Sequence, residues 1–203
     1  MPDPVDIAAI VLAAGTSRRF GTNKLLHPVV RHGLTLPLAA HSLLPWLDTF
    51  PQVSVVVRPS SEMFRSTIEM SLGAARSARI RWVACADAAQ GMSASLACGV
   101  HANRDAAGWL VGLADMPAVP VAAITSVRTA LEGGTKLAAP FCKGRRGHPV
   151  GFGAHYYGDL LGLQGDAGAR SLLERDGSRV ARIEIGSDGI IADIDTLEDL
   201  RRL

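Results

Sequence analysis

Short, continuous apolar runs alternate with segments of helical spacing along most of the chain, and this alternation restricts the fold more than any other feature. Such a run is typical of a strand that helices cover on both faces. This order predicts an α/β fold: a single domain of residues 1–203 with three α/β/α layers and a mostly parallel, Rossmann-like sheet. The predicted strands are 7–13, 53–57, 80–83, 110–113 and 137–139, and the predicted helices are 36–47, about 60–74, 93–100 and 119–132.

The last third of the chain is less regular. The many glycines between 141 and 166 predict loops and short elements over the sheet. Two more strands are predicted at 180–185 and 190–194, around an Asp188-Gly189 turn, and a short helix at 196–203 closes the chain. Ligands of such sheets bind beyond the carboxyl ends of the strands, so the loops that follow the strands hold the candidate site.

Charge and hydropathy exclude several classes of function. The formal net charge is +2, too small an excess to indicate nucleic acid or an anionic membrane as the main partner. No apolar stretch approaches the roughly 20 residues that span a bilayer. Asp3 and Asp6 stand before the first apolar run, where a signal peptide would be basic. The three cysteines lack zinc-ligand spacing and are odd in number, so we expect reduced thiols and a cytoplasmic protein.

The loop after the first strand has the composition of a phosphate-binding site. Gly15 and Gly21 allow tight turns that bring backbone N–H groups close to a ligand, and Ser17 adds a hydroxyl. Arg18 and Lys24 add positive charge, the arginine as a planar fork and the lysine as a point charge. The glycine spacing excludes a Walker A loop and a G-x-G-x-x-G dinucleotide loop. We interpret the loop as a triphosphate cradle, and a solvated basic loop is the alternative.

A second loop, at 90–96, lies between the third predicted strand and a helix. Gly91 permits the close approach of a ligand, and Gln90 can hydrogen-bond a base edge. Ser93 can cap the helix, whose N-terminus favours anions or polar edges. The alternative interpretation is a simple helix cap.

Two acidic positions predict a magnesium site. Asp115 ends an apolar strand, where packing gives a carboxylate no role, although it can also cap the next helix. Asp193 has no local role, since Asp195 or Thr196 can cap the last helix. Magnesium prefers one or two carboxylates together with water and substrate phosphates. The predicted ligands are Asp115 and Asp193, and Asp195 stays open as the alternative to Asp193.

Two further polar segments lie in the C-terminal half. The first is basic and glycine-rich and contains Arg146 and His148, and the second contains Asp166 and Arg170. Taken alone, each has a structural interpretation, as a solvated turn or a capped helix. His148 alone is more typical of a structural than of a catalytic residue.

Taken together, these motifs resemble the molybdenum cofactor cytidylyltransferases of the MobA-like NTP transferase family. The first loop is similar to the L-A-A-G-x-S-x-R-x-G-x-x-K signature that guanylyltransferases and sugar-nucleotide pyrophosphorylases share, with Phe20 where the family often has Met. The later segments resemble Q-G-M-S-x-S-L, D-M-P, R-G-H-P-V-x-F and G-D-x-G-A-R. Leu197 stands where the family's D-T-P-E-D-L stretch has proline. The motifs follow the family order over nearly the whole chain.

The resemblance implies a fold of the nucleotide-diphospho-sugar transferase type, with a nucleotide-binding half at about 1–118 and an acceptor-binding half at about 119–203. It implies Mg²⁺-dependent transfer of CMP from CTP to the terminal phosphate of molybdenum-molybdopterin, since Ala14-Gly15 resembles the CTP enzymes. A molybdoenzyme or its maturation chaperone is the implied recipient of the product.

Residue roles follow from the matched positions. The implied catalytic residues are Arg18, Lys24 and Asp115, and the implied acceptor-binding residues are Arg146, His148, Asp166 and Arg170. The implied nucleotide-binding residues are Leu12, Ala13, Ala14, Gly15, Ser17, Arg18, Lys24, Gln90, Gly91, Met92, Ser93, Ser95 and Asp115.

Other functions stay open at this point. Transfer from GTP, or to another phosphorylated acceptor such as a sugar phosphate or methylerythritol phosphate, would use the same first loop. A non-catalytic carrier of molybdenum cofactor would keep the acceptor motifs, but it would have no need of both Asp115 and Lys24.

Overall fold

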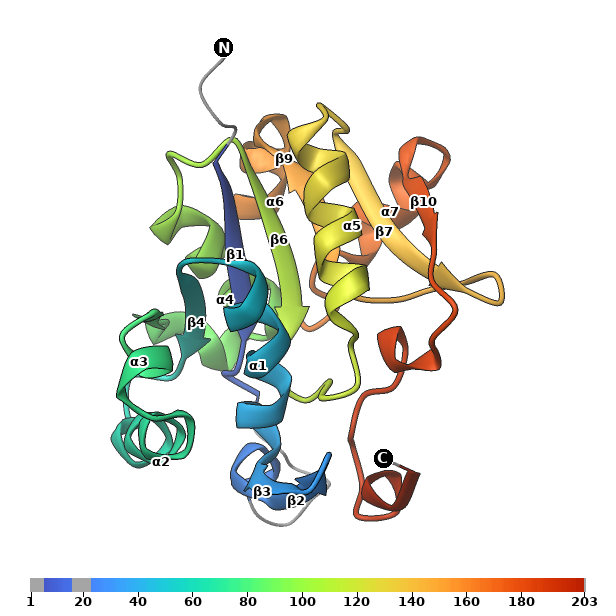
Figure 1. Ribbon diagram of the computed structural model, residues 1–203. Coiled ribbons are helices and arrows are strands. Elements are labelled where there is room, and N and C mark those ends of the chain that lie inside the picture. The colour runs from blue at the N-terminus through green and yellow to red at the C-terminus, as the bar shows by residue number, and fades with distance from the viewer. Residues whose placement is uncertain (1–5, 16–22, 203) are drawn as a thin grey trace.

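One eight-stranded sheet organises the chain in the computed structural model, which describes residues 6–15 and 23–202 and omits the side chain of residue 202 (Figure 1). Its strands are β1 (Ile7–Leu12), β4 (Val53–Val57), β5 (Ile80–Ala84), β6 (Gly108–Leu113), β7 (Leu137–Cys142), β8 (Arg145–Arg146), β9 (Val150–Gly153) and β10 (Ala181–Glu184). The spatial order is β10-β7-β9-β6-β1-β4-β5, with β8 paired to β7. Strand β9 runs antiparallel to β6 and β7, and the β1, β4, β5 and β6 pairings are parallel.

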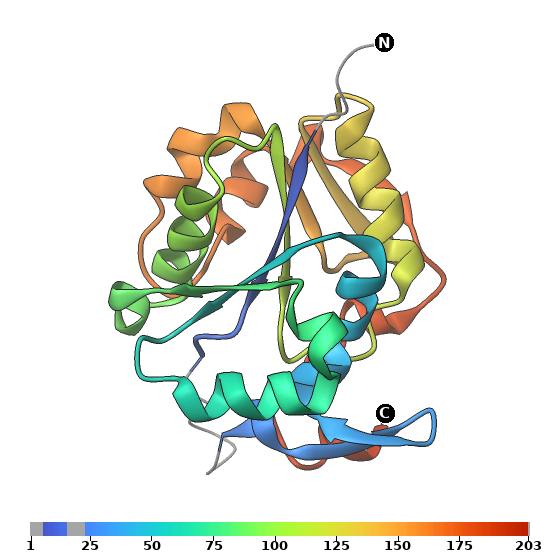
Figure 2. The ribbon, with the colours of Figure 1, turned by 60° about the vertical axis from the view of Figure 1, so that its left-hand side comes forward.

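Helices cover both faces of the sheet (Figures 1 and 2). One face carries α1 (Leu38–Thr49), α2 (Glu62–Leu72) and α5 (Val121–Glu132), and the other carries α4 (Met92–Ala102), α6 (Tyr157–Leu161) and α7 (Arg170–Arg175). A short helix α3 (Ala74–Ser77) follows α2. The predicted three-layer α/β/α fold with a mostly parallel sheet is confirmed.

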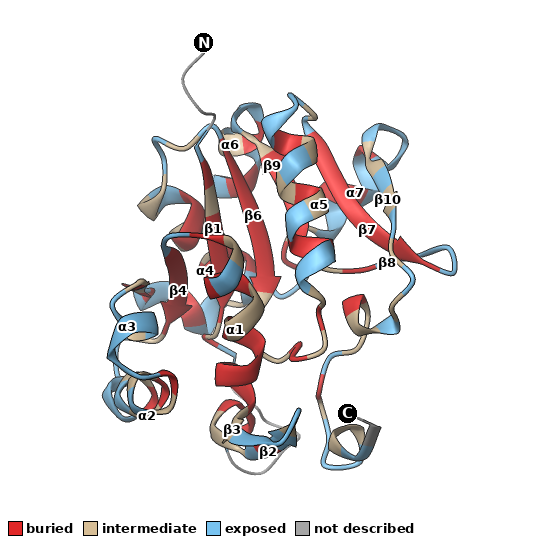
Figure 3. Ribbon diagram, in the orientation of Figure 1, coloured by how far each residue is buried: buried red, intermediate tan, exposed pale blue. Residues whose placement is uncertain are grey.

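The protein has two hydrophobic cores, one on each face of the sheet, and the alternation of side chains along β1 explains why. Ala9 and Val11 face the core on the α1 side, whereas Ile10 and Leu12 face the core on the α4 side. Strands β1, β4, β6 and β7 are consequently buried along almost their whole length (Figure 3). This double burial is why these strands appear in the sequence as continuous apolar runs.

Strands β2, β3, β8 and β9 were not predicted. An antiparallel hairpin, β2 (Pro28–Arg31) and β3 (Leu34–Pro37), precedes α1, so this helix begins at Leu38 and not at 36. Strand β9 lies within the sheet, although its glycines indicated a loop. A Cβ on Gly151 would come within 2.9 Å of side chains of Val127 and Leu131, so α5 packs directly on this glycine.

The strand predicted at 190–194 is wrong. Residues Asp188–Ile190 form a 3-10 turn, η5, and the chain that follows is irregular. Ile190 is buried in the core on the α1 side of the sheet, and Ile194 is buried with Val29 of β2 and Leu38 of α1. Neither residue is paired in the sheet: the Ile190 carbonyl accepts from His148 N, and Ile194 N donates to the Asp115 carbonyl at 3.0 Å. Burial outside a strand therefore produced the same apolar pattern as a strand.

The remaining short turns connect these elements. The final helix is a 3-10 turn and not a helix of residues 196–203, and the side chains of Thr196 and Asp199 cap each other there. None of the described helices is long and apolar enough to cross a bilayer. The 3-10 turns other than η5 are η1 (Lys24–Leu26), η2 (Ala86–Gln90), η3 (Ala154–Tyr156), η4 (Gly177–Arg179) and η6 (Asp199–Arg202).

Candidate active site

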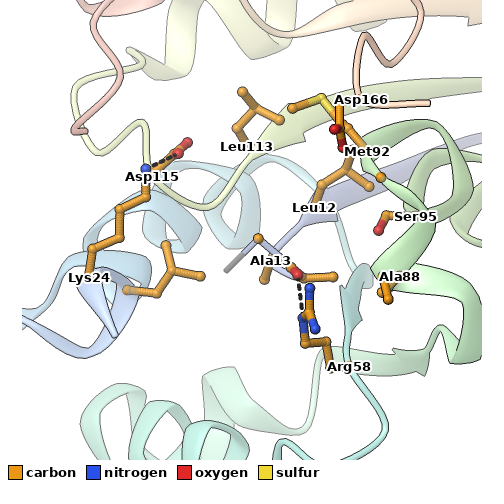
Figure 4. A pocket seen from close by; sticks show the side chains of 15 residues that line it. Leu12, Ala13, Lys24, Arg58, Ala88, Met92, Ser95, Leu113, Asp115 and Asp166 are labelled. Carbon is orange, nitrogen blue, oxygen red and sulfur yellow. Dashed lines mark hydrogen bonds and ion pairs between the residues drawn. The ribbon is translucent and has the colours of Figure 1, made fainter. Parts of the chain in front are cut away.

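A cavity of about 300 Å³ opens at the carboxyl ends of β1, β4 and β6 (Figure 4). This is the edge at which ligands of parallel sheets are expected, because the loops after neighbouring strands converge there. Its lining residues are Leu12, Ala13, Ala14, Gly15, Lys24, Leu25, Arg58, Ala88, Ala89, Gly91, Met92, Ser95, Leu113, Asp115 and Asp166.

The start of the first loop continues the line of β1. Ala13 N donates to the Val56 carbonyl at 2.8 Å, and the Ala14 carbonyl accepts from Arg58 Nε at 2.8 Å. These two bonds hold residues 13–15 against the end of β4. Ser17, Arg18 and Gly21, which were predicted to bind the triphosphate, lie outside the described residues.

Lys24 occupies one end of the cavity. It begins η1, whose N-cap residue Asn23 accepts from Leu25 N at 3.2 Å, and only 8% of its surface is exposed. Its Nζ atom lies 2.8 Å from Oδ2 of Asp115 and 2.8 Å from Oδ1 of Asp195. Burial lowers the pKa of Lys24, but the charges and hydrogen bonds of the two carboxylates outweigh burial and raise it above its usual value. The ammonium group therefore stays charged.

The carboxylates around Lys24 have the chemistry of a divalent-cation site. Asp115 Oδ2 pairs with Lys24, whereas Asp115 Oδ1 is buried and has no hydrogen-bond partner in the described part of the chain. Burial raises the pKa of Asp193, a backbone hydrogen bond lowers it, and the nearby charges of Asp115 and Asp195 raise it again. The hydrogen bond from Ile194 N to the Asp115 carbonyl places Asp193 and Asp195 on either side of that contact.

This excess of carboxylate oxygens and the orphaned Asp115 Oδ1 fit a hard cation such as Mg²⁺ or Mn²⁺. Within residues 6–15 and 23–202, no three His, Cys, Asp or Glu side chains form a ready-made metal cluster. A cation here would therefore take its remaining ligands from substrate phosphates and water, as Mg²⁺ commonly does.

The loop at 90–93 touches the acceptor-side loop at 164–168. Gly91 has φ of +123°, and an added Cβ would overlap the Gly165 carbonyl and approach Asp166 Oδ1 to 2.6 Å. Ser93 N donates to the Gly165 carbonyl at 3.1 Å, and the Ser93 hydroxyl donates to the Gln164 carbonyl at 3.1 Å. Glycine at 91 is therefore required both by its backbone angles and by this close approach.

This contact changes the roles predicted for two residues. Ser93 is fully buried in the joint between the loops and does not line the cavity, and the N-cap of α4 is Gly91. Gln90 does not line it either, since its Nε2 donates to Asp87 Oδ1 at 2.8 Å on the surface. Met92 and Ser95, two more of the predicted nucleotide-binding residues, do line the cavity.

A second cavity, of about 230 Å³, adjoins the first. Arg146, His148 and Arg170 line it, and its walls are otherwise largely apolar. The two cavities share Leu12, Met92 and Leu113. The apolar walls of the second cavity include Leu96, Val111, Val150, Phe152 and Leu173.

Of the predicted acceptor-side residues, Asp166 lies apart from the other three. Asp166 lines the first cavity beside Gly91 and not the second, because the 164–168 loop packs onto the N-terminus of α4. His148 lines the second cavity with Arg146 and Arg170; burial lowers its pKa, although the charge of Asp115 acts in the opposite direction. Its Nδ1 atom is buried and has no hydrogen-bond partner among the described residues.

Arg58 was missed by the sequence analysis. It is a single arginine outside any glycine-rich motif, immediately after β4. The available signal was its position, since a charged residue directly after a buried parallel strand lies at the ligand-binding edge of the sheet.

Comparisons with known proteins show the family to which the chain is similar. The model of the MobA-like NTP transferase domain matches residues 9–180. The purine catabolism protein PucB of Bacillus subtilis is 31% identical over 201 residues, which cover 95% of this chain and 93% of PucB.

Two solved structures are similar over nearly their whole length. A homologue of Mycobacterium tuberculosis Rv0371c from Mycobacterium sp. strain JC1 superposes with a TM-score of 0.80 at 28% identity, covering 97% of this chain and 93% of the homologue. Rv0371c of M. tuberculosis H37Rv, in complex with manganese, gives a TM-score of 0.73 at 24% identity and covers 98% and 97% of the two chains.

Proposed function

This chain belongs to the MobA-like NTP transferase family, and on that premise we propose that it transfers CMP from CTP to the terminal phosphate of molybdenum-molybdopterin. The products are pyrophosphate and molybdopterin cytosine dinucleotide. We further propose that a molybdoenzyme or its maturation chaperone receives the product. Membership of the family makes the chain a nucleotidyltransferase, and the choice of nucleotide and acceptor is the proposal.

One observation carries the proposal: two cavities adjoin at the carboxyl edge of the sheet and share Leu12, Met92 and Leu113. Transfer between two substrates requires both reacting groups in one place, and joining them there supplies much of the rate. The first cavity has Lys24 and Asp115 for a triphosphate. The second has two arginines on apolar walls, which suits a flat ring system that carries a phosphate.

The reaction mainly requires that the negative charge of the phosphates be neutralised. The terminal phosphate of the acceptor is already an anion when it attacks the α-phosphorus of CTP, so no general base is needed. The α–β phosphoanhydride bond breaks, and pyrophosphate takes its electron pair. Lys24, buried and charged, would hold the triphosphate and neutralise the leaving pyrophosphate, together with Arg18. Arg146 and Arg170 would hold the acceptor in line.

A divalent cation, which Asp115 and Asp193 would hold, supplies further charge neutralisation on the phosphates when bound. The fit rests on the orphaned Asp115 Oδ1. The related structure of Rv0371c with manganese supports a divalent metal in this family, and Mg²⁺ is our proposal for this chain.

The acceptor is assigned from the site and the motifs. PucB is named for purine catabolism, and that name identifies neither a nucleotide nor an acceptor. The support for molybdopterin is that the R-G-H-P-V-x-F and G-D-x-G-A-R segments meet around the adjoining cavities, where Arg146 and Arg170 line the second one. A smaller sugar phosphate would leave the apolar walls of Leu96, Phe152 and Leu173 uncovered.

The test is pyrophosphate release with Mg²⁺ and molybdenum-loaded molybdopterin, comparing CTP, GTP, ATP and UTP. We expect release with CTP, and its loss in Asp115→Ala. Release with GTP alone would move the chain to guanylyl transfer. Faster release with a sugar phosphate or methylerythritol phosphate would replace the acceptor. Tight molybdopterin binding with no release from any nucleotide would favour a carrier and contradict the proposal.

A further inference from the structure

Arg58 is a cationic residue that lines the nucleotide cavity. It lies in none of the motifs identified in the sequence. It follows β4, and its Nε atom donates to the Ala14 carbonyl at 2.8 Å. In Figure 4 its guanidinium group lies beside Ala13, away from Lys24 and on the side of Ala88 and Ser95. The hydrogen bond to Ala14 fixes the plane of the guanidinium group, because Nε is part of the rigid fork.

The two ends of the cavity differ in the chemistry of their side chains. Lys24 and Asp115 lie at one end, where charge suits phosphates, and Ala88 and Ser95 lie at the other (Figure 4). The side chains at the second end are mostly small and apolar, among them those of Ala13, Ala14, Ala88 and Ala89. A nucleotide whose triphosphate contacts Lys24 therefore extends its base towards Arg58.

The chemistry of Arg58 restricts which base fits. A guanidinium group only donates hydrogen bonds, and its terminal nitrogens have no other partner in the described part of the chain. Cytosine presents two adjacent acceptors, N3 and O2, which match a fork of donors. Uracil presents an N–H at N3, which would face a donor. Adenine places its amino group beside N1 and N7, whereas guanine offers the adjacent pair O6 and N7.

We propose that Arg58 is the base-selecting residue of this site, donating to the N3 and O2 acceptors of cytosine and thereby discriminating CTP from UTP and ATP. The inference rests on the proposed nucleotidyl transfer for its substrate class. Only a base with both acceptors forms the paired hydrogen bonds with the guanidinium fork, so the discrimination arises from bonds that CTP gains and UTP lacks. Guanine, the other base with adjacent acceptors, is the nearest competitor.

The experiment is equilibrium binding of CTP, UTP, GTP, ATP and 3-deazacytidine triphosphate, without acceptor, to the wild type and to Arg58→Lys. The lysine keeps the charge and loses the fork. We expect the wild type to prefer CTP over UTP and over the 3-deaza analogue, which lacks the N3 acceptor, by about tenfold or more. In Arg58→Lys both ratios should fall to about one, with UTP affinity nearly unchanged.

The matched control is Arg65→Lys, the same substitution on α2, where Arg65 contacts Ser61 and Pro59 and does not line the cavity. It should keep both ratios. If Arg58→Lys weakens the binding of all the nucleotides by the same factor, Arg58 only braces the Ala14 loop, and the inference is overturned. A wild type that binds 3-deazacytidine triphosphate as well as CTP would overturn it even if the variant did not fold.

Different outcomes would contradict the proposed reaction and the proposed role of Arg58. If GTP is preferred and Arg58→Lys abolishes that preference, base selection by Arg58 is supported and cytidylyl transfer is contradicted. If CTP is selected through Arg58 but no acceptor yields pyrophosphate, the inference holds and the proposed reaction fails.

Discussion

The Nζ atom of Lys24 lies 2.8 Å from Oδ1 of Asp195, a residue 171 positions later in the chain. This contact joins the end of the first loop to the C-terminal segment, and Asp115 adds a second ion pair with Lys24 at 2.8 Å. The predicted nucleotide-binding and acceptor-binding halves are therefore not separate in space. The C-terminal segment thus contributes Asp195 to the charged cluster at the Lys24 end of the first cavity.

Replacing Lys24 by alanine should lower turnover by about 100-fold or more, since a buried charge aimed at the phosphates is lost. The variant should remain folded, and the change in its free energy of unfolding should be too small to account for the loss of turnover. Steady-state pyrophosphate release and thermal unfolding of the same preparations measure both. Lys143→Ala, which removes an exposed lysine paired with Asp188, is the control and should stay within about twofold of wild type. Turnover like wild type in Lys24→Ala would refute the role.

Asp115→Asn and Asp193→Asn should each weaken Mn²⁺ binding by at least about tenfold, measured by electron paramagnetic resonance with a non-hydrolysable CTP analogue. Asp195→Asn should weaken it less, because Asp195 Oδ1 already pairs with Lys24. If Asp195→Asn has the larger effect of the two C-terminal variants, then Asp195 and not Asp193 is the second ligand.

Gly91→Ala should destabilise the fold by about 1–3 kcal/mol and also weaken CTP binding, because the new methyl group pushes against Gly165 and Asp166. Gly73→Ala is the matched control. It has the same kind of backbone strain, with φ of +77°, but an added Cβ there meets nothing within 4 Å. It should lose stability and keep CTP affinity. Equal CTP affinity in both variants would show that the contact between the two loops does not shape the nucleotide cavity.

Asp176 should contribute to the stability of the protein at neutral pH and lose that contribution at acidic pH. Its hydrogen bond from Arg175 lowers its pKa below the usual value, burial opposes this, and a hydrogen bond from Tyr156 lowers it further. A depressed folded-state pKa contributes stability above the unfolded pKa, near 4, and this contribution is lost as pH falls through the folded-state value. Asp176→Asn should therefore lower Tm at pH 7 and approach the wild-type Tm near pH 2. A constant difference in Tm from pH 7 to pH 2 would contradict this.

Much of the fold could be predicted because its signals are local. Doubly covered strands such as β1 and β6 leave continuous apolar runs, and α5 ends at a glycine as predicted. The prediction failed where the same local pattern has two causes. Ile190 and Ile194 are buried in hydrophobic clusters although neither lies in a strand, and the glycines of β9 permit close packing by α5 where they indicated a loop.

For the candidate site, local sequence patterns were enough to identify the loops that carry it. Glycines and charges in the loops after buried parallel strands meet at one edge of the sheet, so the cavities lie where Gly15, Gly91 and Asp115 predicted. Which side chains face one another there could not be read from these patterns. The pairing of Lys24 with Asp195, the place of Asp166 beside Gly91 and the contact of Arg58 with Ala14 depend on how distant loops pack together. Such packing is set by contacts between residues far apart in the chain, which no local pattern records.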